Sequence, residues 1–191
     1  MIETPARIEP CLFEDRIPAD LADLVVEIQQ AADSLGRDLH PESAAELADL
    51  VRIMNCYYSN LIEGHNTRPR DIELALEGAE LEEEMRPLAL EARAHVIVQR
   101  RIDEVFRTGS LQQPTSTEFL VWVHKTFYEE MPEEFRYVEH PDGSREEIIP
   151  GHMRQEGDTE VAVGRHRPPS SHRVTDFMAY FEKRFALAER S

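Results

Sequence analysis

The sequence has no apolar run long enough to cross a membrane. A membrane-spanning helix needs about 20 consecutive apolar residues, and no stretch of the 191-residue chain approaches that length. The N-terminus carries Glu3, Glu9 and an early proline, so it lacks the apolar segment of a secretion signal. With 41% hydrophobic residues, the chain is expected to fold rather than remain disordered. We therefore expect a soluble, cytoplasmic protein without a membrane partner.

Cysteine is also scarce. Cys11 and Cys56 are the only two in the chain, which is too few for a disulfide framework. Neither belongs to a Cys-x-x-Cys pair, the spacing of many zinc and redox sites. Because Cys56 falls in an apolar helical run, we expect it to be a buried, reduced thiol.

Positive charge is the third shortage. The chain has 21 lysines and arginines against 38 aspartates and glutamates, which gives a net charge of -17. Proteins that bind nucleic acid neutralise phosphates with clustered Lys and Arg, so this balance argues against a nucleic-acid partner. One local cluster, Arg165, Arg167 and Arg173 with three histidines, is basic. This cluster either receives a nucleotide phosphate or is an ordinary solvated loop.

Several catalytic and metal-binding signatures are missing. The sequence contains no Walker loop, no dinucleotide-binding glycine pattern and no serine nucleophile elbow. Histidines and acids gather near the basic cluster, but their spacing matches no tight ligand pattern, so no protein metal site is expected. These residues are His152, Glu156, Asp158, His166 and His172. We expect no independent catalytic site.

The spacing of apolar residues predicts a mainly α-helical protein. Helices are expected over residues 18–36, 41–64, from 68 through the acidic run 77–84, 87–107, from about 115 past 127, and 174–188. Gly36, Gly64 and Gly109 are expected helix ends, and Thr67 an expected N-cap. The first helix has apolar residues Leu21, Leu24, Val25, Ile28 and Ala32. In the second helix the predicted buried face consists of Ala44, Leu47, Leu50, Val51, Met54 and Tyr58.

One β region is expected between residues 135 and 163, where helical periodicity fails. It contains two short apolar stretches, 147–149 and 161–163. The run His140-Pro141-Asp142-Gly143 is typical of a hairpin turn. The clearest boundary is the connector 109–115, which divides the chain into an N-terminal helical region, 1–110, and a second region, 111–191.

The most specific motif is Ser59-Asn60-Leu61-Ile62-Glu63-Gly64. Positions four apart share a helix face, so Ser59 and Glu63 are expected to project together from the last turn before Gly64. A carboxylate there lies at the negative end of the helix dipole, which is unfavourable unless an arginine or similar donor neutralises it. The alternative is that Ser59 and Glu63 are merely a helix-end pair.

This motif resembles the inhibitory motif of Fic-domain proteins, the family that transfers AMP from ATP onto hydroxyl groups of target proteins. The flanks, 55–58 and 63–73, resemble the family's inhibitory helix and the start of its next helix. Residues 150–154 resemble the family's Pro-Gly-x-x-Arg turn, and 161–169 resemble its flap. The resemblance spans roughly Pro41 to Ala188. It implies a Fic-like helical bundle with one small β-hairpin, the flap, and places the first half of a Fic core in 111–191.

The resemblance also implies roles for individual residues. In the family, the glutamate matched by Glu63 pairs with an arginine of the catalytic motif and keeps the ATP γ-phosphate from its productive position. The flap binds a target peptide along its strand edge, and part of it lies against the nucleotide. The matching target-docking residues are Val161, Ala162, Val163 and Gly164, and the matching nucleotide-binding residues are Val163, Gly164, Arg165 and His166. A plain structural hairpin is the alternative.

The family's catalytic segment, His-Pro-Phe-x-(Asp/Glu)-Gly-Asn-Gly-Arg, does not occur in this sequence. In the family it supplies the histidine base and the acid that holds magnesium, so no catalytic residue is assigned here. We expect the regulatory and target-docking portion of an autoinhibited adenylyltransferase, inactive as this chain alone. ATP with Mg2+ is expected in the complete enzyme, without tight binding to this chain. The alternative is a freestanding helical inhibitor that inserts its Ser59–Gly64 helix into a partner Fic enzyme.

The last predicted helix is unusually apolar. Its apolar residues cover more of the circumference than one stripe requires: Val174, Phe177, Met178, Tyr180, Phe181 and Phe185. In the family, the neighbours of this helix include the catalytic helices that this chain lacks. We therefore expect exposed apolar surface there, which self-association or a second chain would cover.

Overall fold

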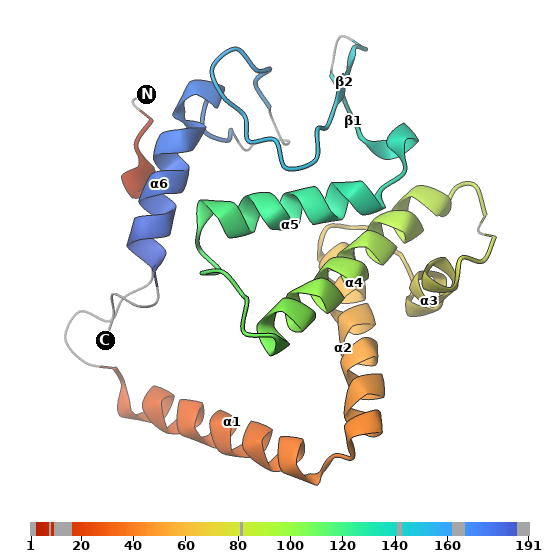
Figure 1. Ribbon diagram of the computed structural model, residues 1–191, viewed down its shortest axis with the longest axis vertical. Helices are drawn as coiled ribbons and strands as arrows, with labels where there is room; N and C mark the ends of the chain where they lie inside the picture. The colour runs from red at the N-terminus through yellow and green to blue at the C-terminus, as the bar shows by residue number, and fades with distance from the viewer. Residues whose placement is uncertain are drawn as a thin grey trace.

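The computed structural model describes residues 3–7, 9, 17–80, 82–140, 143–161 and 167–186. Within these residues the fold is mainly α-helical with one small antiparallel hairpin, as the sequence predicts (Figure 1). The helices are α1 (Ala19–Asp38), α2 (Pro41–Ile62), α3 (Pro69–Glu77), α4 (Arg86–Arg107), α5 (Thr117–Glu130) and α6 (Val174–Phe185). The strands are β1 (Tyr137–Glu139) and β2 (Arg145–Glu147). None of these described helices is both long and apolar enough to cross a bilayer.

The core forms where α2 and α3 pack on α4. Its buried side chains are Ile53, Cys56, Ile72, Ala92 and Val96. Alanines on the inner face of α4 allow the neighbouring backbones to approach closely, so the Cys56 thiol reaches the Ala92 carbonyl at 3.6 Å. Burial raises the pKa of this thiol to about 11. The prediction of a buried, reduced Cys56 is confirmed.

The predicted buried face of α2 is wrong. The buried side chains of α2 are Ile53, Cys56 and Asn60, whereas Leu47, Leu50, Val51 and Tyr58 are exposed. Helical periodicity detects both apolar sides of α2 but does not say which of them meets α4.

Helix ends follow local chemistry, with two exceptions. Helices α2 and α4 end beside Gly64 and Gly109, both in left-handed conformation, as predicted. By contrast, α1 continues through Gly36 to Asp38, where the chain turns extended before Pro41. Helix α3 stops at Glu77, because Gly78 adopts φ 72°, so the acidic run does not extend it.

The second half of the chain is built on α5. The Ser116 hydroxyl caps α5 by accepting from the Phe119 amide at 3.1 Å. Ion pairs join α5 to α4 across the predicted boundary, since Glu130 meets both Arg93 and Arg101. Helix α6 contacts the other side of α5 (Figure 1).

The predicted hairpin turn is confirmed, although its strands differ from the predicted stretches. Strands β1 and β2 pair with Val138 opposite Glu146. Between them, the Gly143 amide donates to the His140 carbonyl at 2.9 Å. Residues 148–149 and Val161 lie outside any strand, so the hairpin precedes the segment that resembles the flap.

The prediction of exposed apolar surface on α6 is wrong for the described side chains. All six apolar residues named above are buried or half-buried, and Phe177 is the most buried. The N-terminal segment reaches α6, where Glu9 accepts from Tyr180 and Arg184. The hydroxyl of Ser170, just before α6, donates to Glu3 at 2.6 Å. The local periodicity of a sequence cannot predict contacts between residues more than 160 positions apart.

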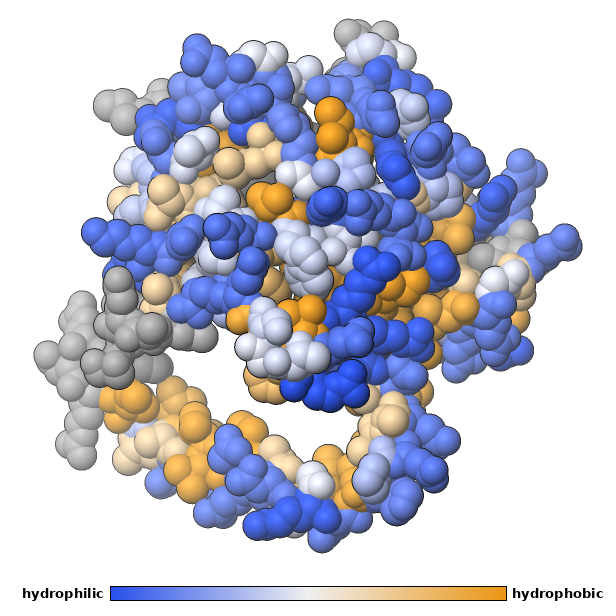
Figure 2. Space-filling view, viewed as in Figure 1, coloured by the Kyte–Doolittle hydropathy of each residue, from blue (hydrophilic) through white to orange (hydrophobic). Residues whose placement is uncertain are grey.

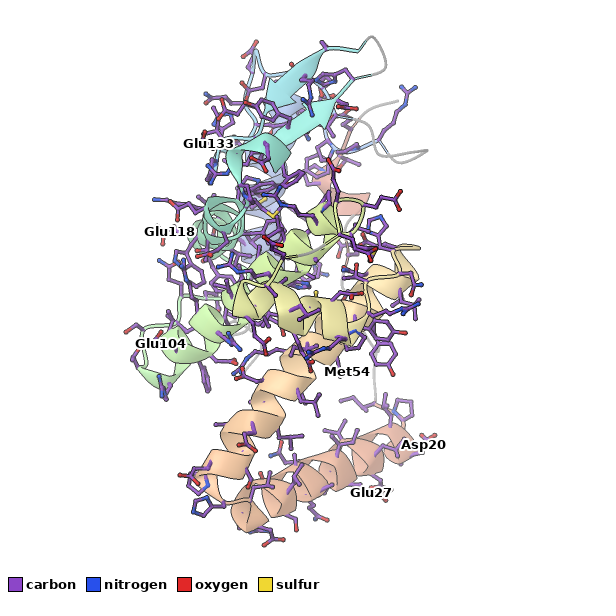
Figure 3. All side chains as sticks on the ribbon, turned by 90° about the vertical axis from the view of Figure 1, so that its right-hand side faces the viewer. Asp20, Glu27, Met54, Glu104, Glu118 and Glu133 are labelled. Atoms are coloured by element: carbon purple, nitrogen blue, oxygen red, sulfur yellow. The ribbon has the colours of Figure 1, made fainter. Side chains whose placement is uncertain are left out.

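The exposed apolar surface lies elsewhere, on α1 and α2. No residue of α1 is buried. Figure 1 shows α1 running away from α2 at the base of the molecule, and Figure 3 shows it, labelled at Asp20 and Glu27, below the other helices. Hydrophobic side chains gather along α1 and the start of α2 in Figure 2.

The core packing predicts a strong effect at Ile72. Replacing this fully buried side chain by alanine leaves a cavity between α3 and α4, so Ile72→Ala is expected to lower the free energy of unfolding by about 2–5 kcal/mol. The matched control is Ile149→Ala, at an exposed position where about 0.5 kcal/mol or less is expected. Urea denaturation followed by circular dichroism measures both, and equal losses would contradict the assigned core.

Candidate functional site

The Ser59–Gly64 motif forms the end of α2, as predicted. The Gly64 amide donates to the Leu61 carbonyl at 3.1 Å, and the His65 amide donates to the Asn60 carbonyl at 2.8 Å. These two bonds form a Schellman end, which needs the left-handed φ of 87° that Gly64 adopts. Ser59 and Glu63 lie one turn apart on α2, and both are exposed.

The Glu63 carboxylate has no donor in the described part of the chain: no side chain there forms a hydrogen bond or ion pair with it. It therefore lies uncompensated at the negative end of the α2 dipole. The donor that the sequence predicts for this carboxylate is therefore not found among the described residues.

The loop after α2 is fixed by a buried polar pair that sequence reasoning missed. The Asn60 amide donates to the Thr67 hydroxyl at 3.5 Å, and both side chains are buried. Thr67 is therefore not the N-cap of α3. Arg68 takes that position, and its amide donates to the Asp71 carboxylate at 3.2 Å. The feature of the sequence that could have indicated this pair is the asparagine, Asn60, inside an apolar helical run.

Among the described residues the same helix end also occurs at Gly109 after α4 and, with a glutamate before the glycine as in α2, at Glu77 and Gly78. There the Ala79 amide donates to the Leu74 carbonyl at 3.0 Å, and Glu77 is exposed like Glu63. The geometry of the helix end alone is thus consistent with the alternative, that Ser59 and Glu63 are merely a helix-end pair. What distinguishes Glu63 is its setting, because Leu61 and Ile62 beside it are exposed, Ile62 at 87%.

The Pro150–Arg154 turn is fixed against α5. Gly151 has φ 77°, and its amide donates to Nδ1 of His124 at 2.9 Å. A Cβ at position 151 would lie 3.0 Å from the Cβ of Lys125, so the backbone approaches α5 as closely as glycine alone permits. Burial lowers the pKa of His124, and the neighbouring His152 lowers it further.

Arg154 ties this turn to the start of α6. Its guanidinium donates to the Pro169 carbonyl at 3.1 Å and lies 3.6 Å from the Glu160 carboxylate. Glu160 in turn accepts from the amide and the hydroxyl of Ser171. These Ser171 bonds, with the positive charge of Arg154, hold the pKa of Glu160 below its ordinary value.

Two of the residues weighed as metal ligands, His152 and Asp158, pair with each other. Nε2 of His152 lies 2.7 Å from Oδ2 of Asp158. Asp158 also accepts from the Gln155 amide, and this bond lowers the pKa of Asp158. Within the described ranges, no three histidine, cysteine or acidic side chains are placed to hold a metal ion. His166 lies outside those ranges.

Most of the predicted flap residues lie outside the described part of the chain. These are Ala162, Val163, Gly164, Arg165 and His166. Val161 is described and is half-buried. Of the basic cluster, Arg173 pairs with Asp176 at 3.0 Å.

Within the described residues, the end of α2 and the 150–161 segment lie apart. The end of α2 packs with α3 and α4, whereas the 150–161 segment packs on α5 and near α6. Figure 1 shows these parts on opposite sides of α5. No hydrogen bond or ion pair between described residues links them. Comparison of the chain with protein-family models, curated proteins and solved structures finds no match.

The His124–Gly151 bond predicts a pH-dependent turn. Nδ1 accepts only when the imidazole is neutral, and the pKa of His124 is lowered on folding. The unfolded chain therefore binds this proton more readily, so the stabilisation is complete above the ordinary histidine pKa of about 6.5 and is lost as pH falls through the lower folded value.

We expect hydrogen-exchange protection of the Gly151 amide, measured by NMR, to fall as pH is lowered from about 7.5 to about 5. In His124→Gln, an acceptor without titration replaces the imidazole, and the pH dependence should disappear. Protection that is constant with pH in the unmodified protein would refute the coupling.

Proposed function

We propose that this chain is a regulatory, non-catalytic portion of a Fic-type AMP-transfer system, in which the Glu63 carboxylate forms an ion pair with a catalytic arginine. The observation that carries the proposal is the exposed Glu63 carboxylate, which has no donor among the described residues and lies one turn after Ser59 on α2. The proposal rests on the sequence resemblance together with this geometry.

The chemistry suits a switch. A guanidinium binds either a carboxylate or a triphosphate through paired hydrogen bonds, so the two compete for one arginine. When Glu63 holds the arginine, the γ-phosphate of ATP cannot take its position. The Schellman end at Gly64 gives the backbone of Glu63 a defined position, because the amides of Glu63, Gly64 and His65 all donate to carbonyls of the last turns of α2.

Target docking is assigned to Val161–Gly164, and contact with the nucleotide to Val163–His166. This assignment follows the resemblance. The closely packed Gly151 turn and the Arg154 bonds support it, because they hold both ends of the 155–169 segment against α5 and α6. ATP and Mg2+ belong to the complete enzyme, and this chain alone is expected to transfer no AMP.

The second candidate is a freestanding inhibitor that inserts the end of α2 into the site of another chain. The exposed side chain of Leu61 favours it, since a helix end meant for a second protein must be accessible. The two candidates use the same carboxylate and differ only in whether the arginine belongs to the same polypeptide.

The test is inhibition of a Fic adenylyltransferase that carries the catalytic motif but lacks its own inhibitory helix. Added in excess, this chain is expected to reduce transfer of labelled AMP. Glu63→Gln should lose that inhibition at least about tenfold, because a hydrogen bond to a charged group contributes about 1.5–3 kcal/mol. Glu77→Gln, at the matching helix end of α3, should inhibit like the unmodified chain. Equal inhibition by both variants would refute the role of Glu63.

The intact mass of the protein from its native cell separates the two candidates. A mass well above 22.0 kDa, with the catalytic motif in the added sequence, supports inhibition within one polypeptide. A mass near 22.0 kDa supports inhibition of a separate enzyme.

A further inference from the structure

Helix α2 has two apolar sides, and only one of them is covered. The covered side carries Ile53 and Cys56, which pack on α4. The opposite side, here called the outer face, carries an apolar residue at every third or fourth position: Leu47, Val51, Met54, Tyr58 and Ile62. All of these except the half-buried Met54, labelled in Figure 3, are exposed. This is the surface that the periodicity of the sequence marked as buried.

Helix α1 presents a second uncovered surface. Its apolar stripe also follows three- and four-residue steps: Ile17 just before the helix, then Leu21, Leu24, Val25, Ile28 and Leu35. Every one of these side chains is exposed, Ile28 at 68%, and Figure 2 shows hydrophobic surface along α1. Most of the stability of a helix in a protein comes from packing of its apolar face, and α1 has no buried residue, so we expect a further surface to cover it.

The stripe and the outer face are complementary. Alternating steps of three and four residues are the pattern of helices that pack along a shared seam. Because the two helices flank a short connection, an antiparallel arrangement would place Leu35 by Ala44, Ile28 by Val51 and Leu21 by Tyr58. Each of these three pairs joins two apolar side chains.

The connection between the helices disfavours this packing within one chain. Leu39 and His40, the two connecting residues, are both extended. Reversing a helix direction over so few residues usually requires a left-handed residue, most often glycine. Neither Leu39 nor His40 favours that conformation, and Pro41 further disfavours a helical conformation at His40. The structure accordingly has α1 directed away from α2 (Figure 1).

We propose that a second copy of this chain covers both surfaces. In this dimer, α1 of each copy packs antiparallel along the outer face of α2 in the other copy. The ten exposed side chains of the stripe and the outer face present roughly 1,000 Å2 per copy, compared with the about 800 Å2 that each partner buries in a standard-size interface. The exchange is reciprocal, so it closes as a symmetric dimer and leaves neither stripe exposed.

Charge opposes the association and gives it a signature. The polar side of α1 carries Asp20, Asp23, Glu27 and Asp33, and each chain has a net charge of -17. Salt screens this repulsion between copies, whereas apolar contacts persist. The dimer is therefore expected to become tighter as ionic strength rises.

Light scattering on the full 191-residue chain tests the assembly. We expect a mass twice the 22.0 kDa of one chain, with the dimer fraction rising from low to high salt. Ile28→Glu on the stripe and Val51→Glu on the outer face should each shift the protein to monomer. The control is Val26→Glu, which is exposed on α1 but lies outside the stripe and should leave the dimer intact. A monomeric unmodified chain, or a dimer that survives both stripe and outer-face variants, overturns the proposal.

Disulfide trapping tests the exchange itself and does not depend on a variant's stability. Ile28→Cys and Val51→Cys are made on separate chains in which Cys11 is replaced by serine, and the two proteins are mixed and oxidised. We expect a covalent dimer that contains one chain of each kind. A disulfide that forms only within a single chain carrying both substitutions would mean that α1 closes on its own α2, and would overturn the proposal.

The dimer is independent of the function proposed for Glu63. Ser59 and Glu63 lie beside the outer face and are not part of it, so Glu63→Gln is expected to leave the dimer mass unchanged. A variant that loses inhibition but stays dimeric tests only the role of Glu63. A variant that becomes monomeric but still inhibits tests only the stripe and the outer face.

Discussion

The fold depends on the contact of α2 and α3 with the alanine-rich side of α4. Small side chains there let Cys56 and Ile72 pack at close range, and this packing fixes which side of α2 faces inward. Once that side is used, the buried Asn60–Thr67 pair holds the loop that leads into α3. The position of Glu63 and the exposure of the outer face both follow from this single contact.

Local chemistry in the sequence was enough to predict most element ends. A glycine that can adopt positive φ ended α2 and α4, and Ser116 capped α5, because each effect involves only a few neighbouring residues. The same reasoning was wrong at Gly36, since glycine permits a helix to end without requiring it. It was wrong again for the acidic run, where Gly78 ended α3 after the first residue of the run, Glu77.

Contacts between distant segments could not be predicted in this way. Periodicity found apolar residues on α6 and α2 but could not tell that Glu9 reaches α6, that Glu3 reaches Ser170 just before it, or that α4 meets the other side of α2. In the candidate site, the sequence located the Ser59–Gly64 end and the Gly151 turn. It gave no indication that His124 would accept from Gly151 or that Glu160 would bind Ser171, since these partners lie 27 and 11 residues apart.

Helix α2 retains two features that are unfavourable in an isolated chain. An acidic side chain at the negative helix end costs a few tenths of a kcal/mol or more, and exposed apolar side chains forgo about 25 cal/mol for each Å2 left in water. The two features lie on different sides of the same helix, and α4 occupies the third. A helix held by one side only can therefore offer a charge to one partner and an apolar seam to another, without either contact disturbing the core.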